Sequence, residues 1–238
     1  TETIDGSKEK RRYLTLLAGT VGLIGSLFIG IAAGAVPITL REVFEVIQGV
    51  TQSENYRIIY YIRMPRVICA ALTGTNLALA GCILQGILRN PLADPGIIGV
   101  TAGAGLAAMA LMLISPELTY FVPFAAFGGA VVASIVVFLL AWEHGIHPLR
   151  LILAGVAIAA FFGGGSAALS VFFSDRIQGT VNWMAGGFAG NSWRHVVMIL
   201  PYSAVGIVAT MCSYRKLNAL QLFKCKIKIL NLRSVLKQ

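Results

Sequence analysis

Few side chains in this 238-residue sequence have the types and spacing that catalysis or metal binding requires. Glu143, His144 and His147 could ligate zinc by residue type, since imidazole and carboxylate groups are zinc ligands. They adjoin Gly145 and Pro148 after an apolar run, which favours a solvated interfacial loop over a metal site. We therefore predict no metal and no cofactor for this chain.

The sequence also lacks the groups that would make it an enzyme. Its apolar runs contain no paired aspartates and no His-Glu-x-x-His motif, and Asp94 and Asp175 fall in expected loops. A glycine-rich G-x-x-x-x-G-K-[ST] loop is absent, so ATP would have to be bound by another chain. His195 stands alone beside Trp193 and Arg194, which favours an interfacial position. We predict no catalytic residue.

Composition places the chain in a membrane. Hydrophobic residues make up 57% of it and charged residues 12%, whereas an ordinary soluble domain is about 25% charged. Six apolar stretches each approach the roughly 20 residues that cross about 30 Å of hydrocarbon. They are 14–33, 67–88, 97–114, 120–142, 149–173 and 196–212. The predicted fold class is all-α, a polytopic membrane helical bundle of about six transmembrane helices.

The net charge of +9 is spread over short segments that flank the apolar runs. Such a distribution sets membrane topology and does not form the basic face with interleaved aromatic residues that nucleic acid would require. Lys8, Lys10, Arg11 and Arg12 precede the first run. The positive-inside rule therefore predicts a cytoplasmic N-terminus in a multi-pass protein of the cytoplasmic membrane.

Small residues recur at every fourth position inside the apolar runs. They are Gly30 and Gly34; Gly74, Ala78, Cys82 and Gly86; Ala125, Gly129 and Ala133; and Gly155, Ala159, Gly163 and Ala167. Residues four apart share one helix face, and small residues there let two backbones approach closely in lipid. The pattern predicts a tightly packed bundle in which few of these glycines line a pathway.

A polar segment between the first two runs contains an expected amphipathic helix. Thr39 and Glu42 have the spacing of a capping box. Apolar residues share one side of the turns that follow: Leu40, Val43, Phe44 and Ile47. The helix is too short and too charged to cross a bilayer, so we expect it to lie on the outer membrane surface.

The second apolar run carries the polar residues that best suit a transport path. Asn76 and Gln85 lie within it, and polar groups at membrane depth face protein or a cavity. Both residues are candidates for a translocation path, and interhelical hydrogen bonding explains them equally well.

A stiff turn follows the second run. Its residues are Asn90, Pro91, Asp94, Pro95 and Gly96. The prolines and the glycine forbid a continuous helix, and the side chains of Asn90 and Asp94 can accept hydrogen bonds from the broken backbone. We predict a defined cytoplasmic turn, and the residues alone leave open whether it is more than a connector.

These stretches together resemble one known family. The strings are Arg-Met-Pro-Arg at 63–66, Asn-Pro-Leu-Ala-Asp-Pro-Gly at 90–96, Leu-Ile-Leu-Ala-Gly-Val-Ala at 151–157, and Asn-Trp-Met-Ala-Gly-Gly-Phe-Ala-Gly-Asn-Ser-Trp at 182–193. In this order and spacing, over roughly 60–222, the sequence is similar to FecCD-type ABC transporter permeases. That family imports iron–siderophore, haem and cobalamin complexes.

The resemblance implies partners and roles. Two permease subunits, alike or different, would form a translocation path in the lipid bilayer, with ATP-binding subunits inside the cell. A substrate-binding lipoprotein or periplasmic protein would deliver an iron chelate from outside, and haem or cobalamin are the alternative cargoes. Arg63 and Arg66 occupy the family's motif for meeting acidic residues of that binding protein. Anchoring at the lipid headgroups is the alternative role for the two arginines.

The resemblance stops after residue 222, where a basic and apolar tail, 223–238, begins. The family has ten spans and continues here with a segment that docks on the ATP-binding subunit. A frameshift in an AT-rich gene is one explanation of the tail, and a genuine short variant with a membrane-surface helix is the other. On either explanation we expect a permease domain at 1–222 with six of the ten spans. A truncated fragment that does not transport is then the alternative function.

Overall fold

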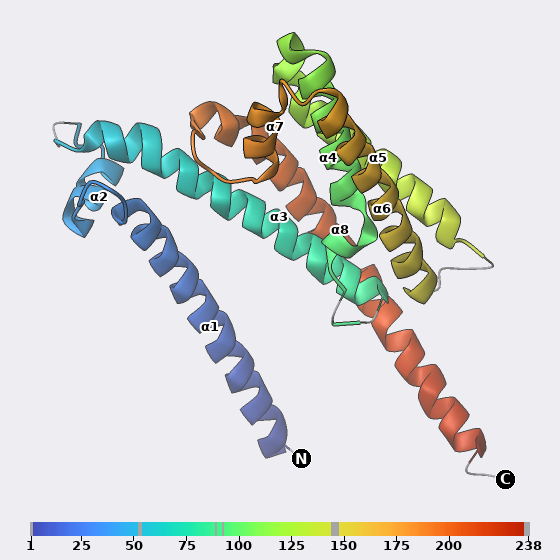
Figure 1. Ribbon diagram of the computed structural model, residues 1–238. Helices are drawn as coiled ribbons and strands as arrows, with labels where there is room; N and C mark the ends of the chain where they lie inside the picture. Colours follow the sequence, from blue (N-terminus) through green and yellow to red (C-terminus); the bar gives the residue numbers. More distant parts are fainter. Residues whose placement is uncertain (1, 52–53, 89, 92, 144–147, 236–238) are drawn as a thin grey trace. The chain divides into compact units, whose positions relative to one another are not determined.

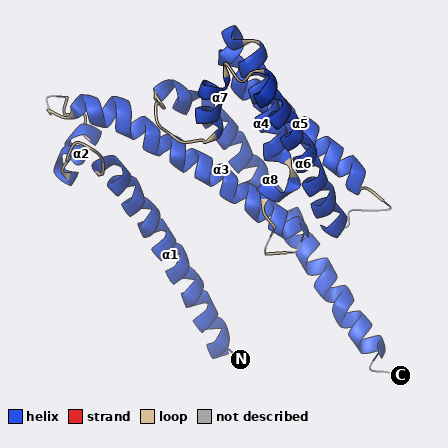
Figure 2. Cartoon of the chain, in the orientation of Figure 1, coloured by secondary structure: helices blue, strands red, loops and turns tan. Residues whose placement is uncertain are grey.

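The computed structural model describes the backbone of residues 2–51, 54–88, 90–91, 93–143 and 148–235, and the side chains of those residues except 2–8, 97 and 215–235. Within this part of the chain every regular element is helical, as Figure 2 shows, which confirms the predicted all-α class. The α-helices are α1 (Glu2–Ala32), α2 (Leu40–Ile47), α3 (Met64–Leu88), α4 (Val100–Ile114), α5 (Val122–Ala141), α6 (Pro148–Phe172), α7 (Ile177–Met184) and α8 (Trp193–Val235). Three shorter elements precede α3, α4 and α5: the π-helix η1 (Ile58–Arg63) and the 3₁₀-helices η2 (Pro95–Ile98) and η3 (Pro116–Phe121).

Five helical stretches in the described residues are long and apolar enough to cross a membrane. They are Glu9–Ala32, Ile58–Leu88, Pro116–Ala141, Pro148–Phe172 and Trp193–Tyr214. The third expected span, 97–114, is instead the shorter apolar helix α4 of 15 residues. Such a helix is about 22 Å long at the usual rise per residue. Gly99 adopts a left-handed conformation with φ 76° and separates α4 from η2, so a single straight helix cannot form there.

The chain divides into two compact units. The first contains Thr1–Thr75 and Phe188–Val205, and the second contains Asn76–Gly187 and Gly206–Gln238. The first unit has a small core of Ile31, Ile38, Val43, Val46 and Ile59.

Helix α2 belongs to that core and begins with the predicted capping box. The backbone N–H of Thr39 donates to Oε2 of Glu42 at 2.7 Å, and the N–H of Glu42 donates to Oγ1 of Thr39 at 3.3 Å. The amide of Asn55 donates to the other oxygen of Glu42 at 2.7 Å. Backbone and side-chain donors from Thr39, with Asn55, hold the pKa of the Glu42 carboxyl below its ordinary value.

The four apolar residues that were predicted to share one side of α2 divide between a buried face and an exposed face in the structure. Val43 is buried in the core of the first unit together with Val46. Leu40, Phe44 and Ile47 are exposed, and the ring of Phe44 stacks on Phe28 of α1 with centroids 5.0 Å apart. Val43 is therefore separated from the three residues with which the sequence grouped it.

The second unit is built around α4, α5 and α6, which lie side by side in Figure 1. A Cβ atom added to Gly103 of α4 would lie 2.5 Å from Cβ of Ala133 and 2.6 Å from the carbonyl oxygen of Gly129, both on α5. The predicted packing role of Gly129 and Ala133 is therefore confirmed. Gly163 of this unit and Gly74 of the first unit differ, because among the described residues no atom beyond the neighbouring backbone of their own helix lies within 4 Å of a Cβ built on either one.

Candidate functional site

The residues that were predicted to meet a binding protein lie at the junction of η1 and α3. In η1 the backbone follows the wide π register, as the N–H of Met64 bonds to the carbonyl of Ile59. A π-helical turn is rare and is often found at functional sites. Arg63 is the last residue of η1, and Arg66 lies in the first turn of α3.

Arg63 is turned inward. Its side chain is only 8% exposed. Nη1 donates to the carbonyls of Ile31 at 2.8 Å and Ala32 at 2.6 Å, and Nη2 donates to the carbonyl of Val36 at 2.6 Å. The last carbonyls of a helix have no partner inside it and carry partial negative charge. The guanidinium therefore caps the end of α1 with charge-assisted hydrogen bonds.

Gly34 makes room for this cap. A Cβ atom at residue 34 would lie 2.6 Å from Nη2 of Arg63 and 2.8 Å from its Cζ. Gly34 was predicted from its spacing with Gly30 to pack helices, and Gly30 does approach α3, with Cγ2 of Val67 3.2 Å from a Cβ built there. The space beside Gly34 is filled by the guanidinium.

Arg66 differs from Arg63 because its side chain is exposed. Only one member of the predicted arginine pair thus presents its side chain to the surroundings. Other basic side chains of the first unit are exposed as well, among them Arg57 and His195. Whether Arg66 contacts a partner stays a prediction.

An aromatic cluster that was not predicted from the sequence surrounds η1. Tyr56 stacks on Tyr60 with ring centroids 5.4 Å apart, and Trp193 lies against Tyr60 at 5.1 Å. Tyr61 packs edge-on against Tyr60 and is 58% exposed. The indole Nε1 of Trp193 donates to the carbonyl of Tyr60 at 2.9 Å. The repeated tyrosines at 56, 60 and 61 were the available signal, since residues four apart meet on one helix face.

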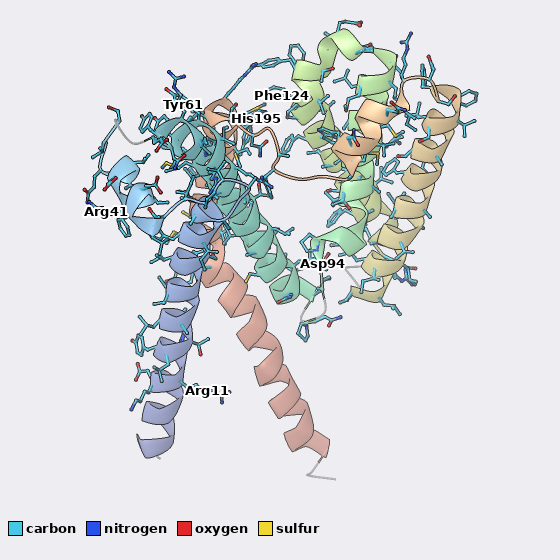
Figure 3. The ribbon with its side chains drawn as sticks, turned by 60° about the vertical axis from the view of Figure 1, so that its left-hand side comes forward. Arg11, Arg41, Tyr61, Asp94, Phe124 and His195 are labelled. Carbon is cyan, nitrogen blue, oxygen red and sulfur yellow. The ribbon has the colours of Figure 1, made fainter. Side chains whose placement is uncertain are left out.

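His195 lies at the start of α8, where it serves the helix end. The backbone N–H of Ser192 donates to Nδ1 of His195 at 3.1 Å, and the backbone N–H of His195 donates to the Ser192 carbonyl at 2.9 Å. The ring is exposed and is labelled in Figure 3. These two hydrogen bonds at the start of α8 are enough to explain why a histidine stands three residues after Ser192.

The predicted turn after α3 is well defined where it is described. Oδ1 of Asp94 accepts from the N–H of Gly96 at 2.6 Å, which starts η2 with Pro95 in its first turn. The carbonyl of Asn90 accepts from the N–H of Ala93 at 3.1 Å, and Pro91 is exposed. Figure 3 shows Asp94 in this turn. The prediction that the Asp94 side chain serves the broken backbone is confirmed.

Gly99 brings the end of this turn against α6. A Cβ there would lie 2.8 Å from the carbonyl oxygen of Gly155, and φ is positive, so the position suits glycine for two reasons. The turn between α3 and α4 therefore follows a specific path, and at Gly99 it packs against α6.

The two path candidates differ in exposure. Asn76 is half-buried, and a Cβ built on Gly206 of α8 would lie 4.0 Å from its Oδ1. Gln85 is exposed. Both residues remain candidates for a path.

The zinc candidate cannot be assembled from the described chain. His144 and His147 lie outside the described residues, and Glu143 forms an ion pair with Arg150. No group of three or more His, Cys, Asp or Glu side chains that could hold a metal occurs where the structure describes the chain.

Long apolar helices that pack through glycine and a short amphipathic helix, α2, are the features of a polytopic helical membrane protein. The profile of the FecCD transport family matches residues 22–226. The Fe(3+)-citrate import system permease protein YfmE of Bacillus subtilis is 38% identical over 196 residues, covering 82% of this chain and 59% of that protein. The iron(3+)-hydroxamate import system permease protein FhuG of the same organism is 32% identical, covering 91% of this chain and 67% of that protein.

A cobalamin import system permease protein, BtuC of Halobacterium salinarum, is also 32% identical, over 87% of this chain and 58% of that protein. Among solved structures, an inward-facing metal-chelate type ABC transporter matches with a TM-score of 0.70 and 26% identity, covering 92% of this chain and 67% of that one. The chain belongs to the FecCD transport family. It spans 55–67% of the length of these and similar relatives. The resemblance inferred from the sequence strings is therefore confirmed, and a transport family agrees with a subunit that is not an enzyme.

Proposed function

We propose that this chain forms membrane-spanning helices of a permease subunit in an ABC importer for iron chelates. The observation that carries the proposal is the family match over residues 22–226. It is supported by five helices long enough to cross a bilayer and by the glycine contact between α4 and α5. The relatives named for Fe(3+)-citrate and iron(3+)-hydroxamate import favour an iron chelate as the cargo.

Cobalamin is the second candidate cargo. The cobalamin permease of Halobacterium salinarum has the same 32% identity as the hydroxamate permease FhuG of Bacillus subtilis. Both cargoes are large, and the half-buried Asn76 and the exposed Gln85 could line a path for either.

The proposed assembly contains a second permease subunit, ATP-binding subunits and an extracytoplasmic binding protein. The N-terminus and the turn at Asn90, Pro91, Asp94, Pro95 and Gly96 would face the cytoplasm, because basic residues flank the first span. Residues 63–66 would then face outward. An exposed arginine there suits an acidic partner, since a guanidinium binds a carboxylate in a bidentate and orienting manner. Arg66 is the exposed arginine of that motif.

The proposal is tested by deleting the gene in its native cell and measuring uptake of three labelled cargoes, ferric citrate, a ferric hydroxamate and cobalamin. We expect loss of uptake for one iron chelate, restored when the intact gene is returned. Loss of cobalamin uptake alone would select the second candidate. Unchanged uptake of all three cargoes would contradict the permease function.

The composition of the chain changes after Leu222, where the basic and apolar tail 223–238 begins. The tail that follows is rich in Lys, Ile, Leu and Asn. We propose to sequence the gene across the codons for Leu222 and Phe223 and to translate all downstream frames. A frame that continues with Gly-Glu and four more apolar spans would support a frameshift, and its absence would support the tail as written.

A further inference from the structure

We infer that α2 contacts the lipid bilayer through a narrow exposed stripe of Leu40, Phe44 and Ile47, and that apolar burial without attraction to anionic lipid holds it there. The contact with lipid rests only on described residues of the first unit. Its assignment to the outer leaflet rests on the proposed function, which sets the orientation of the chain. The sequence predicted one apolar side that also contained Val43, and the structure gives that residue a different role.

The stripe is one of three arcs around the axis of α2. Successive residues of an α-helix are about 100° apart, so Leu40, Phe44 and Ile47 fall within an arc of about 60°. Their side chains are 49–54% exposed. Val43 and Val46 occupy a second arc and are buried in the core of the first unit. The stripe is therefore left uncovered by the described part of the chain.

Polar contacts fix the rotation of α2 about its axis. The Glu42 carboxylate accepts hydrogen bonds from the N–H of Thr39 and from the amide of Asn55, each at 2.7 Å. Turning the stripe toward the core would break the bond to Asn55 and would also expose Val43 and Val46. The protein thus holds the three apolar side chains outward, where only lipid or another apolar surface would spare them from water.

The stripe continues the exposed surface of α1, which is one of the helices long enough to cross a membrane. The ring of Phe44 stacks on Phe28 of α1 with centroids 5.0 Å apart. Phe28 shares a helix face with Ile24 and Val21, four and seven residues earlier, and both of these side chains are exposed. The apolar surface of α1 therefore passes onto α2 through direct ring contact, which favours lipid as the occupant of both.

Aromatic neighbours of α2 suit the boundary between hydrocarbon and headgroups. Tyr56 and Tyr60 pack against the same core as Val43, and Tyr61 contacts Tyr60 edge-on while remaining exposed. Trp193 lies against Tyr60. Tyrosine and tryptophan are enriched at membrane–water interfaces, where an apolar ring and a polar group are both accommodated. This cluster supports a position of α2 at the level of the headgroups.

The third arc of α2 carries its charges and argues against an electrostatic basis. It contains one arginine, Arg41, and two glutamates, Glu42 and Glu45, so it has one net negative charge. Nε of Arg41 also pairs with Oε1 of Glu45 at 2.9 Å. Interfacial helices that bind anionic lipid carry an excess of lysine and arginine on the polar face. Because α2 has no such excess, zwitterionic phospholipid is a sufficient partner.

The test measures which solutes reach spin labels on α2. The full chain, with its four cysteines replaced, is reconstituted in phosphatidylcholine vesicles with one label at position 40, 41 or 47. All three native side chains are exposed, so the labels do not enter the core. Electron resonance measures collisions of each label with oxygen, which concentrates in hydrocarbon, and with a neutral nickel chelate, which stays in water.

We expect oxygen collisions to dominate at positions 40 and 47, and nickel collisions to dominate at position 41, the matched control on the charged arc. Replacing part of the lipid with phosphatidylglycerol, or raising the salt concentration, should leave the ratio of the two collision rates at position 47 unchanged.

Three results would overturn the inference. Nickel collisions at 40 and 47 as frequent as those at 41 would show that the stripe faces water. Weak collisions with both solutes at 40 and 47 would show that protein covers it. Oxygen access that appears only with phosphatidylglycerol and is lost at high salt would show an electrostatic basis. No cargo or partner protein is involved, so failure here would leave the proposed function standing, and failure of the uptake experiment would leave the lipid contact standing.

Discussion

The two compact units join their helices in different ways. In the first unit, directed hydrogen bonds to backbone carbonyls connect separate elements, from Arg63 to the end of α1 and from Trp193 to η1. In the second unit, α4 and α5 meet at Gly103 and Gly129, where an added Cβ atom would clash with the facing helix, Ala133 included.

The difference follows from the backbone that each unit contains. Regular helices satisfy their own backbone groups in lipid, so their association depends on close van der Waals packing and small residues. The first unit contains the end of α1 and a π-helical turn, which leave carbonyls without partners inside the helix. Charged or aromatic donors then have to supply the missing bonds. Packing between regular helices can thus be built from small residues, while helix ends and π-helical turns are connected by specific hydrogen-bond donors.

The largest expected effect comes from removing the donor that serves three carbonyls. Arg63→Gln should lower the free energy of unfolding by about 3 kcal/mol or more, because hydrogen bonds to a charged group contribute about 1.5–3 kcal/mol each and do not add fully. Chemical unfolding in mixed micelles measures the change. Arg57→Gln is the control. Equal stability of the two variants would show that the first unit does not depend on the hydrogen bonds of the Arg63 guanidinium.

The second unit is tested by two neighbouring glycines of α5. Gly129→Ala should destabilise the protein by about 1–3 kcal/mol through overpacking against α4. Gly128→Ala should be neutral or stabilising, because no described atom lies within 4 Å of a Cβ built there. Thermal unfolding of both variants in the same detergent provides the comparison. If Gly128→Ala were the more damaging change, the glycine contact described for α4 and α5 would be wrong.

A smaller effect is expected at η1. Trp193→Phe keeps an aromatic ring beside Tyr60 but removes the indole donor, so we expect a loss of about 0.5–1.5 kcal/mol. Hydrogen exchange of residues 58–64 should accelerate in the variant, while exchange in α4 and α5 should not. Uniform acceleration throughout the chain would contradict a local role for this bond.

The smallest expected effect is a pH dependence of α2. The pKa of Glu42 is lowered in the folded protein, so its contribution to stability is complete above the pKa of an unfolded glutamate and is lost as the pH falls through the lowered folded value. Acidification should therefore destabilise the wild type more than Glu42→Gln, in which the carboxylate is already absent. Thermal unfolding from neutral to acidic pH measures this, and parallel curves for the two proteins would contradict it.

The parts of this structure that were predictable are those with local signals. Gly129 and Ala133 follow a four-residue period, Thr39 and Glu42 form a capping box three residues apart, and Asp94 bonds two residues along the chain. The capping box and the Asp94 bond each name both partners, whereas the four-residue period marks a packing face without identifying the helix that meets it. The shortening of the third expected span depended on a positive φ at Gly99, for which glycine is necessary but gives no unique signal.

The candidate docking residues were less predictable. Arg63 and Arg66 have the same type and lie in one short motif, yet their burial differs. The partners of Arg63 lie 27–32 residues away in the sequence, so no local pattern reveals them. The hydrogen bond from Trp193 to the Tyr60 carbonyl of η1 likewise joins residues that are 133 positions apart.

The most direct test of this account places a photo-crosslinking amino acid at position 66 in cells that contain the complete importer. We predict that the residue at 66 forms an adduct that mass spectrometry identifies as an extracytoplasmic substrate-binding protein. Adducts from position 66 only to cytoplasmic proteins would contradict the outward orientation and with it the proposed importer.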